Sequence, residues 1–256
     1  MKLTLSILTF LLCCFQLAAQ PVNQTDANGK KQGKWQKLYP KNSTVYEYKG
    51  QFKDDKPVGI FTYYYPSSKV KAVITHEEKT GRSVAVMYHE TGVVFARGIY
   101  RNQMKDSIWD YYGPSGRQSM KETYTKNKLN GKSIIYYVPE NPENKSLVPA
   151  KVTNYVNGVL EGEVIEYFDT GVIKNKGKYV AGKLEGLYTM NHPDGTKMIL
   201  ERYRAGVRHG WCATYDQKGA EAGKKYFYHG KEVKGEELEA KLKYYKEKGI
   251  DPNNAK

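Results

Sequence analysis

Two short runs of the chain have residue types and spacings that could bind a phosphate or a metal ion. Residues 131–133 (Gly-Lys-Ser) have the ending of a phosphate-binding loop, but such a loop requires a glycine where this chain has Lys126. Residues 26–29 (Asp-Ala-Asn-Gly) begin like a calcium-binding loop, yet Lys37 stands where a bidentate glutamate is required. Neither run predicts a ligand site.

Nucleophilic and metal chemistry also lack a supporting pattern. His209 and Cys212 have no second His or Cys pair near them in the sequence, so zinc is not expected. Residues 113–116 (Gly-Pro-Ser-Gly) do not form a nucleophile elbow, and no carboxylate pair recurs at a spacing suited to acid–base catalysis. The sequence predicts a protein that is not an enzyme, with no catalytic residue, no metal and no cofactor.

Two groups of residues are candidates for binding. Lys174, Lys176 and Lys178 alternate along one segment, which places three positive charges on one face of a strand and suits an anionic partner. Tyr167 and Tyr215 belong to a tyrosine column that could stack against a ligand. The lysines could equally discourage pairing at a sheet edge, and the tyrosines could form a cross-strand packing ladder.

A repeat of 24 residues sets the position of these candidates. Its units open at Gly33, Gly59, Ser83, Ser107, Gly131, Gly162, Gly186 and Gly210, and all spacings are 24 residues except a first one of 26 and one of 31. The position five residues after the opening holds Tyr64, Tyr88, Tyr112, Tyr136, Tyr167 and Tyr215. A second aromatic column holds Tyr100, Tyr124, Tyr155, Tyr179, Tyr203 and Phe227. A period of this length indicates a stacked array.

Each unit has the composition of a β-hairpin. Short Tyr-, Val-, Ile- and Thr-rich segments alternate with turns, and Gly158, Gly182 and Gly206 supply the positive φ that tight turns require. We therefore expect an all-β repeat array: an elongated, open antiparallel β-meander of about eight 24-residue hairpin units, with a capping α-helix at the C-terminus. Departures from the pattern at Ser83, Ser107 and Asn191 predict looser hairpins there.

The pattern of an opening glycine, a tyrosine five residues later and further glycine turns resembles the MORN repeat. It is most similar to the MORN-2 (YwqK-type) form of bacterial proteins labelled as antitoxin components, and the clearest matches are 158–171, 182–195 and 206–219. The resemblance covers about 200 residues. It implies a fold of stacked hairpins and an antitoxin-like role, although a fold does not fix a function.

The ends of the chain differ from the repeat. Residues 1–20 read as a signal peptide and 21–28 as a linker; 29–235 hold the repeats, interrupted by a proline-rich loop at about 137–154; 236–256 form a helix and a frayed tail. An uncleaved anchor, a lipid on Cys13 or Cys14, and a partner-binding rather than capping helix are the alternatives. Loss of both leader cysteines would leave Cys212 unable to form an intramolecular disulfide.

Charge and export together shape the functional expectation. The net charge is +14, and the mean hydropathy of −0.71 suits a thin sheet with two exposed faces. We expect an exported bacterial envelope protein, located in the periplasm, at the outer membrane or outside the cell, without a transmembrane segment after signal removal. Its sheet would bind a protein or an anionic envelope component rather than nucleic acid. The alternative is an antitoxin or immunity-type protein that neutralises a toxin.

Overall fold

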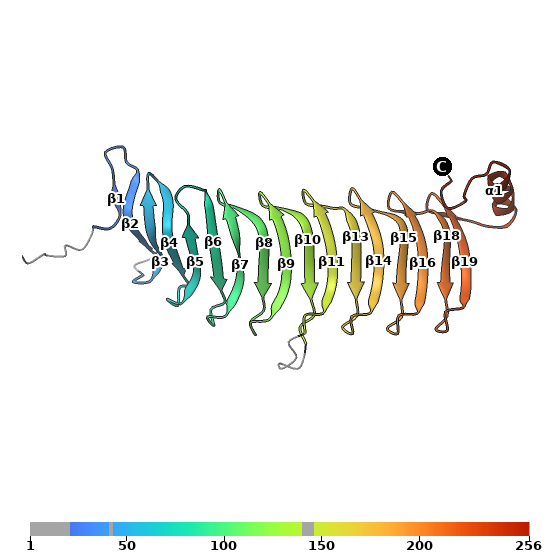
Figure 1. Cartoon of the computed structure of the whole chain (residues 1–256), viewed down its shortest axis with the longest axis horizontal. Helices are drawn as coiled ribbons and strands as arrows, with labels where there is room; N and C mark the ends of the chain where they lie inside the picture. Colours follow the sequence, from blue (N-terminus) through green and yellow to red (C-terminus); the bar gives the residue numbers. More distant parts are fainter. Residues whose placement is uncertain (1–20, 41–42, 140–145, 256) are drawn as a thin grey trace, which may run out of the picture.

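The computed structural model describes residues 21–40, 43–139 and 146–255, and these form one open antiparallel β-sheet with a single α-helix at its C-terminal end (Figure 1). The sheet does not close into a barrel, which confirms the expected meander of hairpins and the C-terminal helix. The expected signal peptide, the centre of the proline-rich insertion and Lys256 lie outside the described residues.

The strands follow one another across the sheet in chain order, apart from two short strands that each share a neighbour with the strand after them. Most are six to nine residues long. They are β1 (Gln24–Thr25), β2 (Lys31–Leu38), β3 (Tyr46–Lys53), β4 (Lys56–Tyr64), β5 (Val70–His76), β6 (Arg82–Tyr88), β7 (Val94–Arg101), β8 (Met104–Tyr112), β9 (Gln118–Thr125), β10 (Lys128–Tyr136), β11 (Pro149–Val156), β12 (Val159–Leu160), β13 (Gly162–Tyr167), β14 (Ile173–Val180), β15 (Lys183–Asn191), β16 (Lys197–Arg204), β17 (Val207–Arg208), β18 (Gly210–Tyr215), β19 (Glu221–Tyr228) and β20 (Lys231–Val233); the helix α1 spans Gly235–Glu247.

Two kinds of tight turn connect the strands. Within a unit, a glycine such as Gly92 or Gly195 donates its N–H back across the turn to the carbonyl of His89 or His192. Between units, two consecutive residues both adopt positive φ, as a type I′ turn requires. The second of these residues is Gly158, Gly182 or Gly206 in three units, with φ of 88°, 77° and 88°, so the turn register is confirmed.

The opening residues of the repeat face the second aromatic column across the hairpins. The opening residue pairs with the aromatic residue of the return strand, as in Gly131 with Tyr155 and Gly186 with Tyr203. The opening glycines Gly33, Gly59, Gly131, Gly162, Gly186 and Gly210 all have positive φ. The unit that opens at Ser107 keeps this conformation, with φ of 59°, although serine lacks the freedom of glycine.

The prediction of a looser hairpin at Ser83 is wrong. Where an opening residue has positive φ, pairing with the preceding hairpin is interrupted, as between Lys49 and Gln51 opposite β4. Ser83 has no positive φ, and β5 pairs with β6 in an unbroken register. Ser83 is also buried, and its Oγ lies 2.8 Å from His76 Nδ1. Serine here replaces an irregularity with a continuous ladder.

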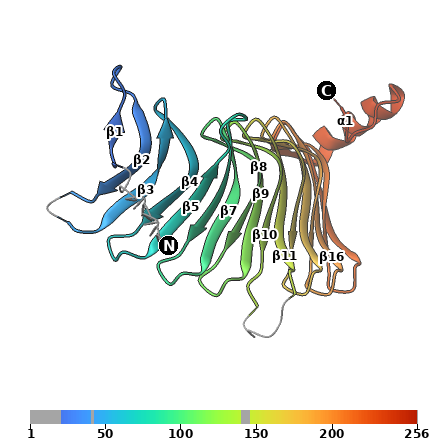
Figure 2. The ribbon, with the colours of Figure 1, turned by 60° about the vertical axis from the view of Figure 1, so that its left-hand side comes forward.

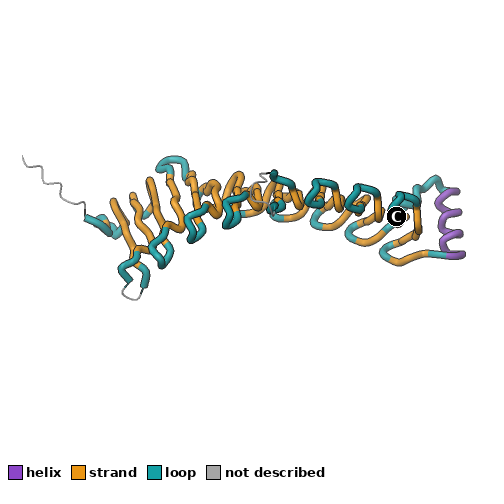
Figure 3. The backbone as a smooth tube through the Cα atoms, turned by 90° about the horizontal axis from the view of Figure 1, so that it is seen from below, coloured by secondary structure: helices purple, strands orange, loops and turns teal. Residues whose placement is uncertain are grey.

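The sheet is a single layer of strands (Figure 3). At the last hairpin α1 packs on one face, where Tyr226 is 1% exposed and clusters with Tyr245, and the other face buries side chains along most of the sheet. We call this the aromatic face; it carries the residues at even positions after each opening residue, among them Phe61, Trp109 and Tyr188. Phe61 is 2% exposed, whereas its neighbour Ile60 on the opposite face is 61% exposed. The two faces of the sheet therefore differ in burial.

Glycines in the return strands allow the large rings of the aromatic face to pack closely. A Cβ at Gly98 would overlap the Trp109 indole of the next hairpin, and a Cβ at Gly50 would overlap the Phe61 ring. Where the next hairpin carries a small residue, the return strand carries a larger one: Ile74 pairs with Ala85. Packing of one hairpin on the next is thus achieved by complementary side-chain size.

The helix and the tail pack on the last hairpin. Tyr245 of α1 clusters with Tyr226, Val233 and Ala255, and Leu238 and Leu242 pack against them. The prediction of a frayed tail is wrong for its described part, because Ala255 is 1% exposed and Tyr226 donates a hydrogen bond to the Pro252 carbonyl at 2.8 Å. The helix ends at Glu247, and Gly249 follows the C-cap Lys248 with φ of 63°.

Two segment boundaries differ from expectation. Gln24–Thr25, placed in the linker, forms β1 and pairs with β2. Residues 149–154, placed in the insertion loop, belong to β11, where Val152 pairs with Ile134 of β10. Both segments gain backbone hydrogen bonds from a neighbouring strand, and the hydrophobic pattern alone did not indicate this.

Candidate functional site

Basic side chains are concentrated on the face opposite the aromatic one. We call this the basic face and define it by the residues one and three positions after each opening residue, with their cross-strand partners. Its charged members are the bases Lys34, Lys49, Arg97, Lys121, Lys132, Lys176, Lys178, Arg202 and Lys224, and the acids Asp110 and Glu163. The face therefore carries a positive field along the length of the sheet.

The aromatic face has no such imbalance. Its charged members in the rows two and four residues after each opening residue, with their partners, are Lys37, Lys151, Lys225, Glu122, Glu166 and Glu201. Lys151 Nζ lies 2.8 Å from Glu166 Oε1, and the hydrogen bond between them lowers the pKa of the Glu166 carboxyl. The excess charge within the sheet thus belongs to one face, which the sequence analysis did not predict.

Two of the three candidate lysines, Lys176 and Lys178, belong to the basic face, and Lys174 lies at the β-bulge opposite Tyr167. Lys178 is opposite Glu163, and Lys176 is opposite Ile165. The side chains of both lysines therefore project from the same face of the sheet as those of Glu163 and Ile165. Lys176 Nζ forms an ion pair with Glu163 Oε1 at 2.8 Å, whereas Lys174 and Lys178 are exposed. β14 is paired on both sides, so the interpretation of these lysines as edge charges is wrong.

The two candidate tyrosines are on the basic face but are not brought together. Tyr167 ends β13 and Tyr215 ends β18, four strands away, which corresponds to about 19 Å. Both rings are half-buried, and Lys197 Nζ lies 5.1 Å from the centre of the Tyr215 ring. The candidate site is therefore the lysine group beside Tyr167, with Tyr215 at a separate position on the same face.

The tyrosine column is not a stack of rings. Equivalent residues of successive hairpins are separated by two strand spacings, about 9.6 Å, which is too far for ring contact. Among the described residues no ring pair joins two members of this column, whereas ring pairs such as Tyr100 with Trp109, 4.9 Å between ring centres, lie on the aromatic face. The interpretation of the column as a packing ladder is wrong.

The residue after the tyrosine column connects neighbouring units. Tyr39 Oη donates to the Tyr64 carbonyl at 2.6 Å, and Tyr65 Oη donates to the Tyr88 carbonyl at 2.7 Å. The same contact recurs farther along the sheet, where Tyr137 Oη donates to the carbonyl of Tyr167 at 2.8 Å. The signal was available in the sequence, because an aromatic residue or histidine often follows the tyrosine.

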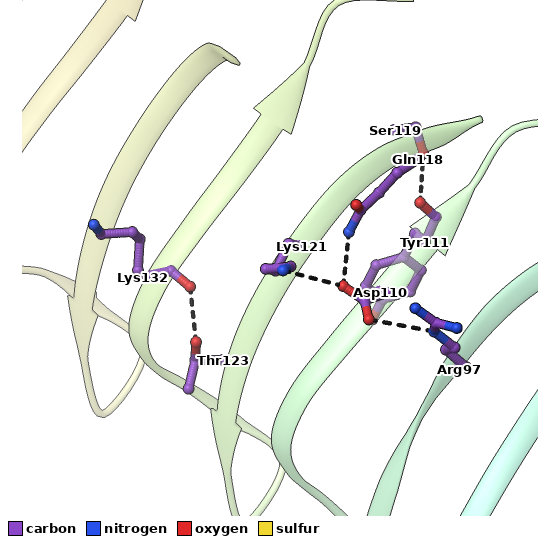
Figure 4. A network of polar contacts seen from close by, with 8 residues as sticks. All are labelled: Arg97, Asp110, Tyr111, Gln118, Ser119, Lys121, Thr123 and Lys132. Atoms are coloured by element: carbon purple, nitrogen blue, oxygen red, sulfur yellow. Dashed lines mark hydrogen bonds and ion pairs between the residues drawn. The ribbon is translucent and has the colours of Figure 1, made fainter. Parts of the chain in front are cut away.

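A polar network occupies the centre of the basic face (Figure 4). Asp110 Oδ2 lies 3.4 Å from Arg97 Nε, and Asp110 Oδ1 lies 3.7 Å from Lys121 Nζ. Gln118 Nε2 also donates to Asp110 Oδ1 at 2.7 Å. One carboxylate is thus shared by two cations from the strands on either side, so positive charge remains in excess even here.

On the aromatic face the protein fills a cage of rings with its own lysine. Lys105 Nζ lies 4.7 Å from the Trp109 ring centre and 4.9 Å from that of Tyr124, and it donates to Tyr111 Oη at 2.8 Å. Burial lowers the pKa of the Lys105 ammonium. Because the cation is internal, these rings are not free to bind an external ligand of the same kind.

Apolar side chains are interspersed with the charges of the basic face. Ile60, Val84, Ile108 and Leu187 occupy the first position after the opening residue in their units and are all exposed. This mixture of exposed aliphatic residues with lysine and arginine could contact a partner through both apolar burial and charge.

The described residues contain no group of three His, Cys, Asp or Glu side chains that could hold a metal ion. Within the same part of the chain, no helix has the length and apolar character needed to cross a membrane. No family model and no curated protein matches the chain.

Proposed function

We propose that this protein is a non-enzymatic, exported interaction or scaffold protein of a bacterial cell envelope. Its basic face binds an anionic surface, either of a protein partner or of another envelope component. The observation that carries the proposal is the charge distribution, because the basic residues of the sheet gather on one face with only Asp110 and Glu163 among its central rows. Such a field attracts and orients negatively charged partners.

The architecture supports a binding role. Among the described residues, no second layer runs along either face of the sheet, and α1 packs on the last hairpin (Figure 2). A long exposed sheet offers many weak contacts at regular spacing, so a partner with repeated negative charges gains affinity from several units at once. A membrane of anionic lipids or an acidic protein surface has this property.

The binding proposal is tested with vesicles and three lysines. We replace Lys174, Lys176 and Lys178 with Gln, because Glu at position 176 would repel Glu163, whose Oε1 is 2.8 Å from Lys176 Nζ. Protein lacking residues 1–20 should sediment with phosphatidylglycerol vesicles and not with phosphatidylcholine vesicles. The triple variant should bind the anionic vesicles several-fold more weakly at low salt, and the difference should shrink as salt rises.

A matched control removes the same charge elsewhere. Lys79, Lys126 and Lys218 are exposed in connecting turns, and their change to Gln should leave vesicle binding within about twofold of the parent. Equal weakening in both triple variants would mean that net charge, not the basic face, drives binding. Salt-insensitive binding that is lost in Tyr167→Ala or Tyr215→Ala, with folding intact, would instead locate the site at the tyrosines.

Export and the second candidate function have separate tests. Fractionation of the native cell should find the chain without residues 1–20 outside the cytoplasm; intact cytoplasmic protein would contradict export. The resemblance to MORN-2 (YwqK-type) proteins favours the alternative, an antitoxin or immunity-type protein. Copurification with one stoichiometric partner that is toxic when expressed alone would establish that alternative over a scaffold role.

A further inference from the structure

The sheet ends on a strand that is only partly paired. β19 pairs with β18 along its length, but β20 covers its outer side only at Tyr226–Tyr228. Within the described residues, no strand pairs with the outer side of residues 221–225, and most of these residues are exposed. In Figure 1, α1 lies beside the other end of β19 and leaves this segment open. Unpaired backbone groups at an edge are a template for another strand.

The repeat indicates which backbone groups face outward. In β16, the Arg202 carbonyl accepts a hydrogen bond from His209 of the following hairpin, and Arg202 is equivalent to Tyr226 in β19. Backbone groups alternate in direction along a strand, so Lys224 presents its N–H and C=O groups to the open side. In β16 the equivalent residues Ile199 and Leu200 pair with the next hairpin, so Gly223 and Lys224 can form the same antiparallel contacts with an added strand.

A cavity of about 430 Å³ is lined by residues of β16 to β19 and reaches the edge strand at Gly223. Its lining includes Cys212, Thr214, Gly223 and Phe227. In earlier units, the small residue equivalent to Gly223 is paired with a large side chain of the next hairpin, as in Ala72 with Met87 and Ala96 with Tyr111. Gly223 has no following hairpin opposite it, so the space that a ring or a methionine fills elsewhere is open here.

The pairing of β7 with β8 shows what kind of strand could pair with the open side of β19. In β7, Ala96 and Arg97 pair with Tyr111 and Asp110 of β8, and Asp110 forms an ion pair with Arg97 (Figure 4). Gly223 and Lys224 are the equivalents of Ala96 and Arg97 in the last unit. Lys224 Nζ lies 4.8 Å from the Trp211 ring centre and takes part in no ion pair of the described residues. A carboxylate opposite Lys224 would complete the pattern.

We propose that residues 221–225 of β19 bind an extended segment of a partner protein that carries an acidic residue followed by an aromatic one. The segment adds a strand to the sheet, its carboxylate pairs with Lys224, and its aromatic ring enters the cavity beside Gly223. This site is separate from the basic-face proposal and does not depend on it. Backbone pairing supplies affinity, and the acidic–aromatic pair supplies specificity.

A second copy of the chain does not fit this site. The strand that a second copy could offer is β2, at the other end of the sheet, and its equivalent residues are Gln36 and Lys37. In this register Gln36 would lie opposite Lys224 and Lys37 opposite Gly223, and neither residue is acidic or aromatic. The outer side of β2 is also covered near its start by β1. The geometry therefore favours a different protein as the partner.

The test uses a peptide with the sequence of residues 104–112, which contains the acidic–aromatic pair of β8. The protein lacking residues 1–20 is isotopically labelled and titrated with the unlabelled peptide, and the chemical shifts of the protein's backbone amides are recorded. We expect saturable binding with shifts centred on residues 221–225. Replacing the peptide's aspartate at the position of Asp110 with Lys should weaken binding at least tenfold, and so should Ala at the position of Tyr111.

Protein variants complete the test. Lys224→Glu should weaken the parent peptide at least tenfold and restore binding of the Lys-substituted peptide, and Gly223→Val should weaken both peptides by filling the cavity. Lys132→Glu, a charge reversal on an interior strand, should change binding less than twofold. If Gly223→Val misfolds, the exchange of peptide preference in Lys224→Glu still decides the outcome.

Three results would overturn the proposal. The first is an absence of saturable peptide binding to folded protein. The second is binding whose shifts lie away from residues 221–225 or that is unaffected by Lys224→Glu. The third is concentration-dependent self-association of the parent protein that Lys224→Glu abolishes, which would make a second copy the occupant. The vesicle experiment is unaffected by any of these, so the two proposals fail separately.

Discussion

The complementary packing of successive hairpins is tested most directly at Gly98. A Cβ added there would lie 2.5 Å from Cε2 and 2.6 Å from Cγ of Trp109, about 1 Å closer than ordinary contact. Trp109 is 1% exposed and donates a hydrogen bond to the Ile99 carbonyl at 3.1 Å, so the ring has little freedom to move. Overpacking of this kind costs about 1–3 kcal/mol, and the lower backbone entropy of alanine returns about 0.5–1 kcal/mol.

We therefore expect Gly98→Ala to lower the free energy of unfolding by about 1–2 kcal/mol and Tm by about 2–8 °C. The measurement is thermal and urea unfolding followed by circular dichroism. Gly113→Ala is the control, because the nearest heavy atom to a Cβ there is the Arg117 carbonyl oxygen at 4.0 Å. This variant should be neutral or more stable by up to about 1 kcal/mol.

A double mutant separates steric overlap from other causes. Trp109→Ala alone should cost about 3–5 kcal/mol by leaving a cavity. In that background, Gly98→Ala should be neutral or stabilising, because its methyl group enters the space that the indole left. Additivity of the two changes within about 0.5 kcal/mol would refute the packing argument. So would a Gly98→Ala variant that is as stable as the Gly113→Ala control.

Three further predictions concern stability. Burial raises the pKa of Tyr203 to about 12 and also raises the pKa of Tyr111. The stability that these two tyrosines contribute is therefore fully present below pH 10 and is lost as the pH rises through their pKa values in the folded protein. Tyrosinate absorbance and circular dichroism should change together in an alkaline titration, and early ionisation without unfolding would contradict this. Ser107→Gly should stabilise the folded protein by about 1 kcal/mol, because Ser107 has φ of 59°. Ser83→Gly should destabilise the folded protein by removing the buried hydrogen bond with His76. Urea unfolding that reverses this order would be inconsistent with the assigned backbone. Ala255→Glu should lower Tm by several degrees because the residue is 1% exposed, and an unchanged Tm would mean that the tail is not packed in solution.

The architecture was predictable because the repeat encodes it locally. Glycine occurs at positions such as Gly182 and Gly206 because the tight turn there requires a positive φ, and the 24-residue period repeats this requirement along the chain. The same logic failed at Ser83, because a missing glycine was interpreted as a weaker unit when it marks an unbroken ladder. The absence of glycine showed that positive φ is not required at this position, but it did not show that a continuous ladder forms there instead.

The site was less predictable because sidedness depends on register. Lys176 and Lys178 share a face by simple alternation, and this could be predicted. That Lys132 and Arg202 lie on the same face required the register of their own hairpins, in which Lys132 pairs with Asn154 and Arg202 with Leu187. The tyrosine column was misread for a related reason: one residue per hairpin recurs on every second strand, which is too distant for contact.

The pairing of each hairpin only with its neighbours in the chain also constrains how the fold forms. Every ladder joins strands separated by a single turn or by one short strand, and no strand waits for a partner from the far end. Loop closure is therefore inexpensive at every step, and structure can grow in the order of synthesis or of release from a narrow channel. The proline-rich insertion between β10 and β11 is the longest closure along this route. A pause in assembly is expected there, dividing the growing sheet into an early and a late half.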